Sequence, residues 1–215
     1  MHCIRFFYLH IFFKCDKIHI MEFEVTIIKF LQSFRSIPLD RFFLMITTAG
    51  STIGFITLFL FLIFKSKHLA FTYFLTYLGA SFLNSYILKP SIERLRPFQA
   101  FPFEIMSIGG DTAGFSMPSG HALSCAITMT FVVLAVFLFA KSKKVKIFTC
   151  ILATTFLILV MVSRMYLGQH YLTDVIVGAV LGILASLLGF YLDYLYLQRK
   201  FLKLKGLYDE HNRDN

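Results

Sequence analysis

The stretch Ser163–Asp174 reads Ser-Arg-Met-Tyr-Leu-Gly-Gln-His-Tyr-Leu-Thr-Asp and separates two strongly apolar segments. His170 and Asp174 are four residues apart, so on a helix they would lie one turn apart on the same face. At that spacing a carboxylate can hold one imidazole nitrogen while the other acts as a base or nucleophile. Arg164 adds a permanent, forked cation that suits phosphate oxygens. The stretch therefore indicates a reactive site, although by itself it does not identify the reaction.

The composition of the 215-residue chain indicates an integral membrane protein. Hydrophobic residues make up 57% of the chain and charged residues only 15%, whereas a soluble domain is roughly half apolar and a quarter charged. Long apolar runs account for the excess. We therefore expect one membrane domain at 21–200 and a cytoplasmic tail at 201–215, with little mass outside the bilayer.

Apolar runs long enough to cross a hydrocarbon core, which takes about 20 residues, recur along the chain. They predict five membrane-spanning helices, at 42–64, 68–88, 120–140, 145–163 and 172–196. A shorter helical pattern at 22–36 could lie in the interface or make a tilted crossing, and the sequence does not decide between the two. The predicted fold is an all-α integral membrane helix bundle of about six transmembrane helices.

Small residues mark one face of the last predicted span. Gly178, Gly182 and Gly189 recur near helical spacing, and small side chains allow helices to approach closely. We expect this face to pack within the monomer. A dimer seam has no support in the sequence, which leaves the oligomeric state open.

The N-terminal residues 1–20 mix aromatic and charged side chains in a run too broken for a spanning helix. They also lack the small-residue cleavage site of a signal peptide. Met21 opens a more ordinary start. We therefore expect Met21 to be the natural initiator and residues 1–20 to be a dispensable extension, although the sequence alone does not decide between Met1 and Met21.

The net charge of +9 is distributed as membrane topology requires rather than as nucleic-acid binding would. Most positive residues lie in short loops between apolar spans. The alternation of spans puts eleven of them on one side: Lys65, Lys67, Lys141, Lys143, Lys144, Lys146 and five in the tail. The positive-inside rule places this side in the cytoplasm.

The opposite surface, beyond residue 41, carries only four cations and two histidines: Lys89, Arg94, Arg96, Arg164, His121 and His170. These cations oppose the charge bias that sets the topology, so we expect a function for them rather than ordinary loop charge. The predicted active site therefore faces outward. The short loops suit a bacterial protein of the cytoplasmic membrane.

Two further clusters lie on this predicted outer surface. One reads Lys-Pro-Ser-Ile-Glu-Arg-Leu-Arg-Pro at 89–97, and the other reads Pro-Ser-Gly-His at 118–121, where a span begins. In phosphoryl transfer the protein mainly positions and neutralises the migrating group. Lys89, Arg96 and Arg164 could do this without a metal.

Ser119 and Gly120 could contribute to the same task. Ser119 is placed as a helix N-cap, so the free backbone N–H groups that follow it can face an anion. Gly120 has no side chain to block that approach.

No metal site or cofactor is expected. The acids of the outer surface are scattered along the chain: Glu93, Glu104, Asp111 and Asp174. A Mg²⁺ or Zn²⁺ site would need them clustered. The cysteines form no CxxC pair, and we expect them to be inert packing residues: Cys3, Cys15, Cys125 and Cys150.

The three clusters together resemble the type 2 phosphatidic acid phosphatase superfamily. They match its KxxxxxxRP, PSGH and SRxxxxxHxxxD motifs in order and spacing, with no motif residue missing between 89 and 174. The flanking spans agree with the six-helix membrane architecture of that family. The resemblance implies an enzyme, a phosphatase.

The resemblance also implies roles for individual residues. His170 would be the nucleophile that forms a phosphohistidine, and Asp174 would orient it. His121 would protonate the leaving oxygen and then help to activate the hydrolytic water. The phosphoryl group would be bound by Lys89, Arg96, Ser119, Gly120 and Arg164. Arg94 and Glu93 lie outside the motif letters, and we interpret them as pairing with each other or with lipid headgroups.

The unbroken spans favour a lipid substrate over the soluble substrates of other members of the superfamily. We predict metal-independent hydrolysis of lipid phosphate or diphosphate monoesters such as phosphatidylglycerophosphate and phosphatidate. The alternative is hydrolysis of undecaprenyl pyrophosphate, which recycles the cell-wall lipid carrier, and a non-catalytic lipid-binding or transport protein comes third. Apolar residues of the loop at 98–116 could guide a lipid or merely cover the bundle. No nucleic-acid partner is expected.

Overall fold

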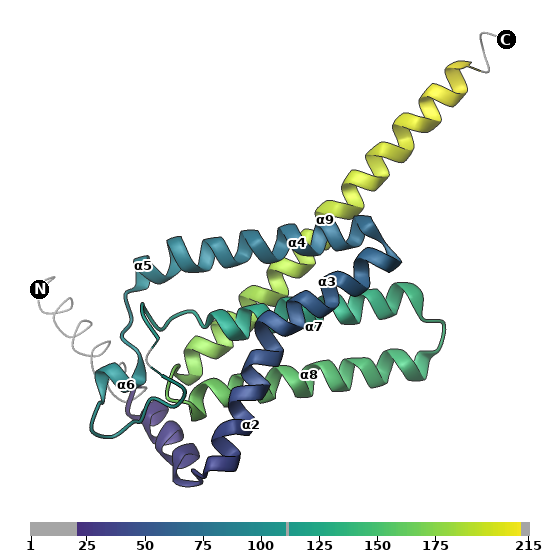
Figure 1. The fold of residues 1–215 in the computed structure, drawn as a ribbon. Helices are drawn as coiled ribbons and strands as arrows, with labels where there is room; N and C mark the ends of the chain where they lie inside the picture. Colours follow the sequence, from purple (N-terminus) through teal and green to yellow (C-terminus); the bar gives the residue numbers. More distant parts are fainter. Residues whose placement is uncertain (1–20, 111, 212–215) are drawn as a thin grey trace, which may run out of the picture.

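The computed structural model of the chain describes residues 21–110 and 112–211. The described chain is helical, without strands, and most of its helices run lengthwise through one bundle (Figure 1). The predictions about residues 1–20, and about Asp111 and the end of the tail, lie outside the described residues. The all-α membrane bundle expected from the sequence is confirmed.

Four helical stretches of the described chain are long and apolar enough to cross a membrane: Ile37–Lys65, Gly120–Phe139, Lys143–Tyr166 and Leu172–Arg199. The first combines α2 (Ile37–Thr48), the π-helix η1 (Ala49–Ile53) and α3 (Gly54–Lys65). The second and third are α7 and α8, and the fourth belongs to α9 (Leu172–His211). These match four of the five predicted spans.

The fifth predicted span, at 68–88, is also helical. It comprises α4 (Lys67–Phe82) and the π-helix η2 (Leu83–Leu88), and the helix α5 (Lys89–Ile92) continues it. Polar residues such as Thr76 and Asn84 interrupt its apolar sequence, and it is absent from the described stretches that satisfy the length and apolarity criteria. A count of six transmembrane helices therefore remains a prediction.

Serine caps set the starts of three helices. The Ser119 Oγ accepts a hydrogen bond from the Ala122 N–H at the start of α7, as predicted. Ser66 and Ser142 cap α4 and α8 in the same way. A serine oxygen satisfies a backbone donor that the first helical turn leaves free. The caps therefore fix where each helix begins at the membrane surface.

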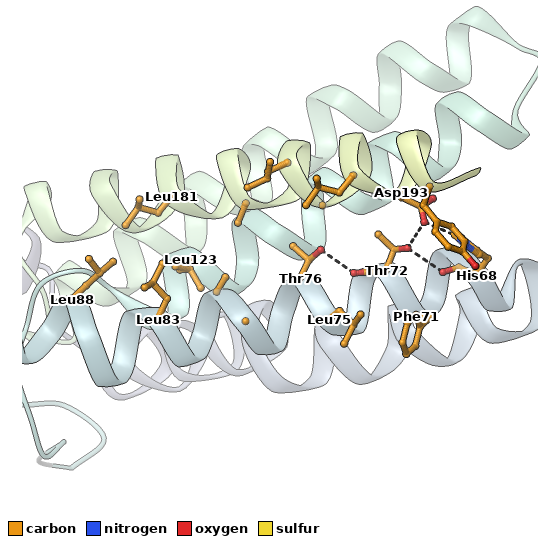
Figure 2. A pocket seen from close by; sticks show the side chains of 17 residues that line it. His68, Phe71, Thr72, Leu75, Thr76, Leu83, Leu88, Leu123, Leu181 and Asp193 are labelled. Carbon is orange, nitrogen blue, oxygen red and sulfur yellow. Dashed lines mark hydrogen bonds and ion pairs between the residues drawn. The ribbon is translucent and has the colours of Figure 1, made fainter. Parts of the chain in front are cut away.

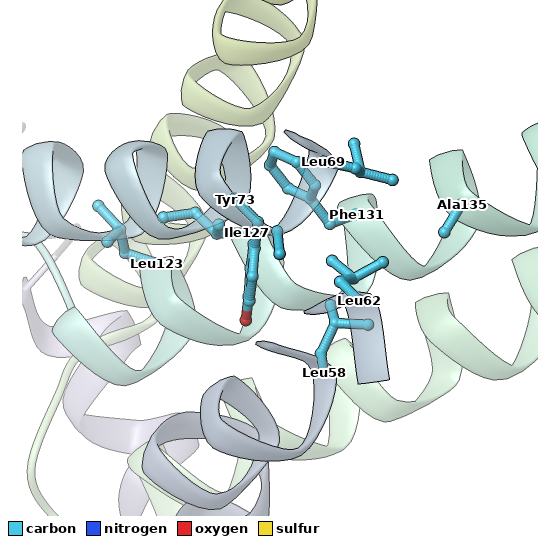
Figure 3. Packing of buried hydrophobic residues seen from close by; sticks show 9 residues of the cluster. Leu58, Leu62, Leu69, Tyr73, Leu123, Ile127, Phe131 and Ala135 are labelled. Atoms are coloured by element: carbon cyan, nitrogen blue, oxygen red, sulfur yellow. The ribbon is translucent and has the colours of Figure 1, made fainter. Parts of the chain in front are cut away.

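A hydrophobic cluster holds α3 and α4 against α7 (Figure 3). Tyr73 lies at its centre, fully buried, and its hydroxyl is 2.8 Å from the Thr128 Oγ1. Around it pack Leu58, Leu62, Leu69, Leu123, Ile127 and Phe131. This packing fixes α4, which leads through η2 to Lys89, relative to α7, which begins beside His121.

Glycines bring α9 into close contact with its neighbours. A Cβ on Gly178 would lie 2.5 Å from the carbonyl oxygen of Ser119, and one on Gly182 would lie 2.5 Å from that of Leu123. A side chain at Gly189 would meet Thr76 of α4. The small face of the last span thus packs within the monomer, as predicted. It places the starts of α7 and α9 side by side.

The helix that covers residues 21–33 packs across the end of the bundle where α5 and α6 (Pro97–Ala100) lie (Figure 1). Val25 and Ile28 are buried in a cluster with Ile105 of the following loop and Tyr171 at the start of α9. Its opposite face exposes Phe23 and Phe30, each more than 60% accessible. The helix therefore braces the loops that carry the predicted site.

Candidate active site

The residues of the three predicted clusters meet at one end of the bundle, because each stands at a helix end. Lys89 begins α5 and Arg96 caps α6, whereas Arg164 lies in the last turn of α8. His170 lies in the turn between α8 and α9, and Asp174 lies in the first turn of α9. Residues separated by up to 85 positions are thus gathered by helix packing.

A tight turn positions His170. Gly168 has a φ of +72°, a left-handed conformation that glycine adopts without strain. A Cβ there would also collide with the carbonyl oxygen of Met106. The backbone N–H groups of Gln169 and His170 both donate to the Arg164 carbonyl, at 3.1 and 3.3 Å. The turn therefore holds the imidazole in a fixed position between the two helices.

His170 and Asp174 form the predicted pair, with the Nδ1 3.6 Å from the Oδ2 and both side chains buried. They do not share a helix, because α9 begins only at Leu172. The carboxylate instead reaches back over the turn, where its Oδ2 accepts the Tyr171 N–H at 2.9 Å. The Ser116 hydroxyl also donates to this oxygen. Asp174 is thus oriented by donors on both sides.

The opposite imidazole nitrogen faces a cation. The His170 Nε2 lies 3.3 Å from the Nη1 of Arg96, which can only donate, so the Nε2 accepts with its lone pair. Burial lowers the pKa of His170 to about 3, which keeps the ring neutral at physiological pH. A neutral imidazole with its lone pair on Nε2 is the form that can attack phosphorus.

Three buried or half-buried cations gather near the His170–Asp174 pair without carboxylate partners among the described residues. Arg96 donates to the Gly114 and Gln169 carbonyls at 3.0 and 3.2 Å, and the Lys89 Nζ donates to the Phe115 carbonyl at 2.7 Å. Arg164 donates to the Thr47 Oγ1 at 3.3 Å, and its Nε has no partner. Among the described residues no acid pairs with any of the three.

The electrostatics of these cations favour an anion. Burial, together with the nearby charge of Arg96, lowers the pKa of Lys89 to about 8. Burial likewise lowers the pKa of Arg96. Positive charges forced together in this way are stabilised when an anion enters between them. The geometry therefore fits a phosphoryl group bound by charge and by the forked guanidinium donors.

The PSGH cluster lies beside this cation site. The Ser119 N–H donates to the Asp174 carbonyl at 3.0 Å, and Gly120 starts α7. His121 follows half-buried, within electrostatic range of His170 and of the three cations. The structure thus brings all eight predicted site residues to one end of the bundle. His121 lies at the edge that borders a polar pocket.

The sequence did not reveal the residues that bind the second carboxylate oxygen of Asp174, its Oδ1, and those that pair with them in turn. The Arg94 Nη1 donates to the Asp174 Oδ1 at 2.7 Å and to the Thr173 Oγ1 at 2.6 Å, and its Nη2 pairs with Glu24. Glu24 also accepts the Thr173 N–H at 2.7 Å. Arg94 lies over the Tyr171 ring, 4.0 Å from its centroid.

The interpretation that Arg94 pairs with Glu93 or with headgroups is therefore wrong. Glu93 instead ends α5 in a left-handed conformation, exposed to solvent. The signal available in the sequence was Glu24 itself, an acid flanked by apolar residues on a short amphipathic helix. A charge in such a setting is rarely buried without a partner, but no pattern in the neighbouring sequence identifies that partner.

The fold and the site define a membrane helix bundle whose unpaired cations surround a neutral histidine, an arrangement suited to phosphoryl groups. The model of the PAP2 superfamily matches residues 69–196, so the chain belongs to this family. The predicted resemblance to the type 2 phosphatidic acid phosphatases is thereby confirmed.

Relatives of the chain are named as phosphatases. Phosphatidylglycerophosphatase B of Bacillus subtilis (strain 168) is 37% identical over 113 residues, which is 49% of this chain and 49% of that protein. The match thus spans about half the length of that relative. Lipid A 4'-phosphatase of Porphyromonas gingivalis is 28% identical over 193 residues, 86% of this chain and 78% of that protein.

Solved structures share the fold. The crystal structure of a transmembrane PAP2-type phosphatidylglycerolphosphate phosphatase from Bacillus subtilis superposes with a TM-score of 0.70 at 26% identity. The match covers 87% of this chain and 94% of that one. Aquifex aeolicus LpxE superposes with a TM-score of 0.61 at 20% identity, over 79% and 95% of the two chains, and supports the fold alone.

Proposed function

We propose that the protein is a phosphatase of membrane lipids that hydrolyses phosphate esters through a phosphohistidine on His170. One observation carries the proposal: Lys89, Arg96 and Arg164 gather without a carboxylate partner among the described residues, and Arg96 contacts the Nε2 of a neutral histidine. A phosphoryl group would supply both the negative charge that pairs with these cations and the electrophilic phosphorus that the Nε2 attacks.

The chemistry follows from the placement of the two histidines. The His170 Nε2 attacks phosphorus, the bond from phosphorus to the leaving oxygen breaks, and His121 gives its proton to that oxygen. Asp174 faces the Nδ1 and stabilises the charge that develops on the ring. A water then attacks phosphorus and gives its proton to His121, the phosphorus–nitrogen bond breaks, and phosphate leaves.

The cations act on the charge that spreads over the phosphoryl oxygens. The Arg164 Nε is a buried donor without a partner, and it is available to an oxygen of the bound group. Arg96 already contacts the His170 Nε2, so an oxygen bound by Arg96 lies next to the attacking atom. Such donors are most effective in a site that excludes water.

Apolar surface beside the site supports a lipid substrate. A groove of about 630 Å³ runs between α4 and α9, from Leu88 next to Lys89 towards His68 and Asp193 (Figure 2). Its walls are leucines such as Leu75 and Leu181, and a polar cluster of His68, Asp193 and Thr72 closes the far end. An acyl chain would fit along such a groove with its phosphate at the site.

The name of one relative favours phosphatidylglycerophosphate as a substrate, and the lipid A phosphate named by the other belongs to the same chemical class. Phosphatidate, another lipid phosphate monoester, is a further candidate. Undecaprenyl pyrophosphate remains the second candidate. The excess of lysine and arginine on the opposite side supports an active site on the outer face of the cell membrane. The exposed Phe103 of the loop after α6 lies at this end, where it can enter the interface.

Phosphate release by the purified protein in detergent, with EDTA present, tests the proposal. The panel holds phosphatidylglycerophosphate, phosphatidate and undecaprenyl diphosphate. His170→Ala should abolish release, whereas the control Lys144→Ala, exposed at the start of α8 and outside the groove, should retain it. Rapid acid and alkaline quenching should trap an alkali-stable, acid-labile phosphoprotein in the parent and none in His170→Ala. Release that survives in His170→Ala would exclude the assigned nucleophile, and no release from any lipid would exclude the enzyme activity.

A further inference from the structure

A second, polar pocket adjoins the site on the side of His121. It has a volume of about 250 Å³, which is room for roughly eight water molecules at about 30 Å³ each. Ser51 and Thr52 line it from η1, Asn84 and Ser85 from η2, and His121 from the start of α7. The pocket contains no lysine, arginine, aspartate or glutamate. Its polar groups are therefore suited to a neutral ligand that forms hydrogen bonds.

Asn84 is the group in this pocket that lacks a partner. Its side chain is 2% exposed, and its Oδ1 accepts no hydrogen bond from any described residue. The Asn84 Nδ2 is directed at the start of α7, 3.6 Å from the position of a Cβ on Gly120. A buried carbonyl oxygen without a donor is costly. The only other buried side-chain atom without a partner in the described chain is the Arg164 Nε of the cation site.

Two helices depart from α-helical geometry at this pocket. Segments with π-helical hydrogen bonding are rare and frequently occur at functional sites. Both such segments of the described chain, η1 and η2, direct polar residues into the same pocket. Thr52 and Ser85 make no side-chain hydrogen bond within the described residues, so their hydroxyls are free for a ligand.

We propose that this pocket binds the alcohol from which the phosphate is removed, and that the Asn84 Oδ1 accepts a hydrogen bond from a hydroxyl of that alcohol. The inference rests on the proposed function. His121 protonates the leaving oxygen, so the atoms attached to that oxygen lie on the side of His121, in this pocket. None of the three cations lines this pocket.

The inference names a substrate class, the phosphate monoesters of hydroxylated alcohols such as a glycerol headgroup. The glycerol unit offers a hydroxyl donor to Asn84 and is itself uncharged, and in phosphatidylglycerol the phosphodiester anion is three carbons away from the leaving oxygen. A diphosphate substrate would instead place a second, charged phosphate directly in the pocket, whose lining includes no lysine or arginine to pair with it. Burying an unpaired charge is more costly than burying a neutral group. The pocket therefore discriminates against polyprenyl diphosphates.

A matched pair of lipids tests the proposal with the full chain. One is phosphatidylglycerophosphate, and the other is its analogue whose terminal glycerol is replaced by 1,3-propanediol and thus lacks the hydroxyl. The parent should show a kcat/KM about tenfold higher for the hydroxylated lipid, as expected for one hydrogen bond to a buried acceptor. Farnesyl diphosphate should be the poorest substrate. Asn84→Leu should remove the preference within the pair, whereas Tyr86→Phe, an exposed change in the same segment, should retain it.

The parent protein alone can overturn the inference, so the test does not depend on the folding of a variant. Equal kcat/KM for the two lipids, or faster hydrolysis of farnesyl diphosphate, would overturn it while the phosphatase activity stands. An unchanged preference in Asn84→Leu would overturn the role of Asn84. No phosphate release from any of the lipids would instead contradict the proposed function.

Discussion

Replacement of Arg94 by alanine should leave two buried carboxylates without a counter-charge. The guanidinium pairs with Asp174 at 2.7 Å and with Glu24, and the side chains of these acids are 0% and 1% exposed. Arg94 itself is 20% exposed. The three groups link the helix at 21–33 to the start of α9. Loss of Arg94 should therefore affect both the stability of the fold and the placement of Asp174, the proposed catalytic carboxylate.

The magnitude follows from the burial. Removal of one partner of a buried ion pair destabilises a protein by about 3–5 kcal/mol, because the remaining charge stays unpaired. The partial exposure of Arg94 points to the lower end, about 3 kcal/mol. Asp174 would still accept hydrogen bonds from the Ser116 hydroxyl and the Tyr171 N–H. Its carboxylate should therefore shift rather than leave the site. A shift of about 1 Å in such a group costs about 100-fold in rate.

The assay combines two measurements on the purified protein. The free energy of unfolding is obtained by titration with SDS in mixed micelles, and kcat/KM is obtained from phosphate release. Arg41→Ala is the matched control, because Arg41 is exposed and makes no described contact. Arg94→Lys retains the charge but loses the fork that reaches both acids, so it should fall between Arg94→Ala and the parent. If Arg94→Ala unfolds within about 0.5 kcal/mol of Arg41→Ala and retains its rate, the reasoning is refuted.

Two further predictions concern charge and packing. Because the pKa of Lys89 is about 8, this lysine loses its charge as the pH rises, and kcat/KM should fall above about pH 8. Lys89→Arg should move that decline to higher pH, and an unmoved decline would exclude Lys89 as its cause. In α9, Gly178→Ala should destabilise by about 1–3 kcal/mol, because its Cβ would lie 2.5 Å from the Ser119 carbonyl oxygen. The control is Gly79→Ala, because a Cβ at Gly79 would meet no atom within 4 Å. This variant should change the unfolding free energy by no more than about 1 kcal/mol. Equal effects of the two variants would contradict this account of the packing.

The sequence predicted the helices and most of the site because both depend on local signals. Apolar runs are readable in any window of about 20 residues, and serine caps such as Ser119 announce a helix start within three positions. The motif residues are readable for a similar reason, since each cluster is contiguous. The helix at 68–88 was also predicted from its sequence, but its membrane crossing stays a prediction, because polar residues that line a pocket and a groove interrupt its apolar run.

The tertiary structure alone decided how distant residues meet. Arg94 and Glu24 are 70 positions apart, and Ser116 and Asp174 are 58 apart. Whether they touch depends on how the helix at 21–33 and the loop before α7 pack over the start of α9. The orientation of Asn84 likewise depends on the π-helical turn of η2. Sequence patterns report which face of a segment is apolar, whereas the pairing of buried charges is set by the packing of several segments at once. By itself, the sequence therefore determined the membrane helices and the reactive groups, and only the packed bundle determined which residues hold those groups in place.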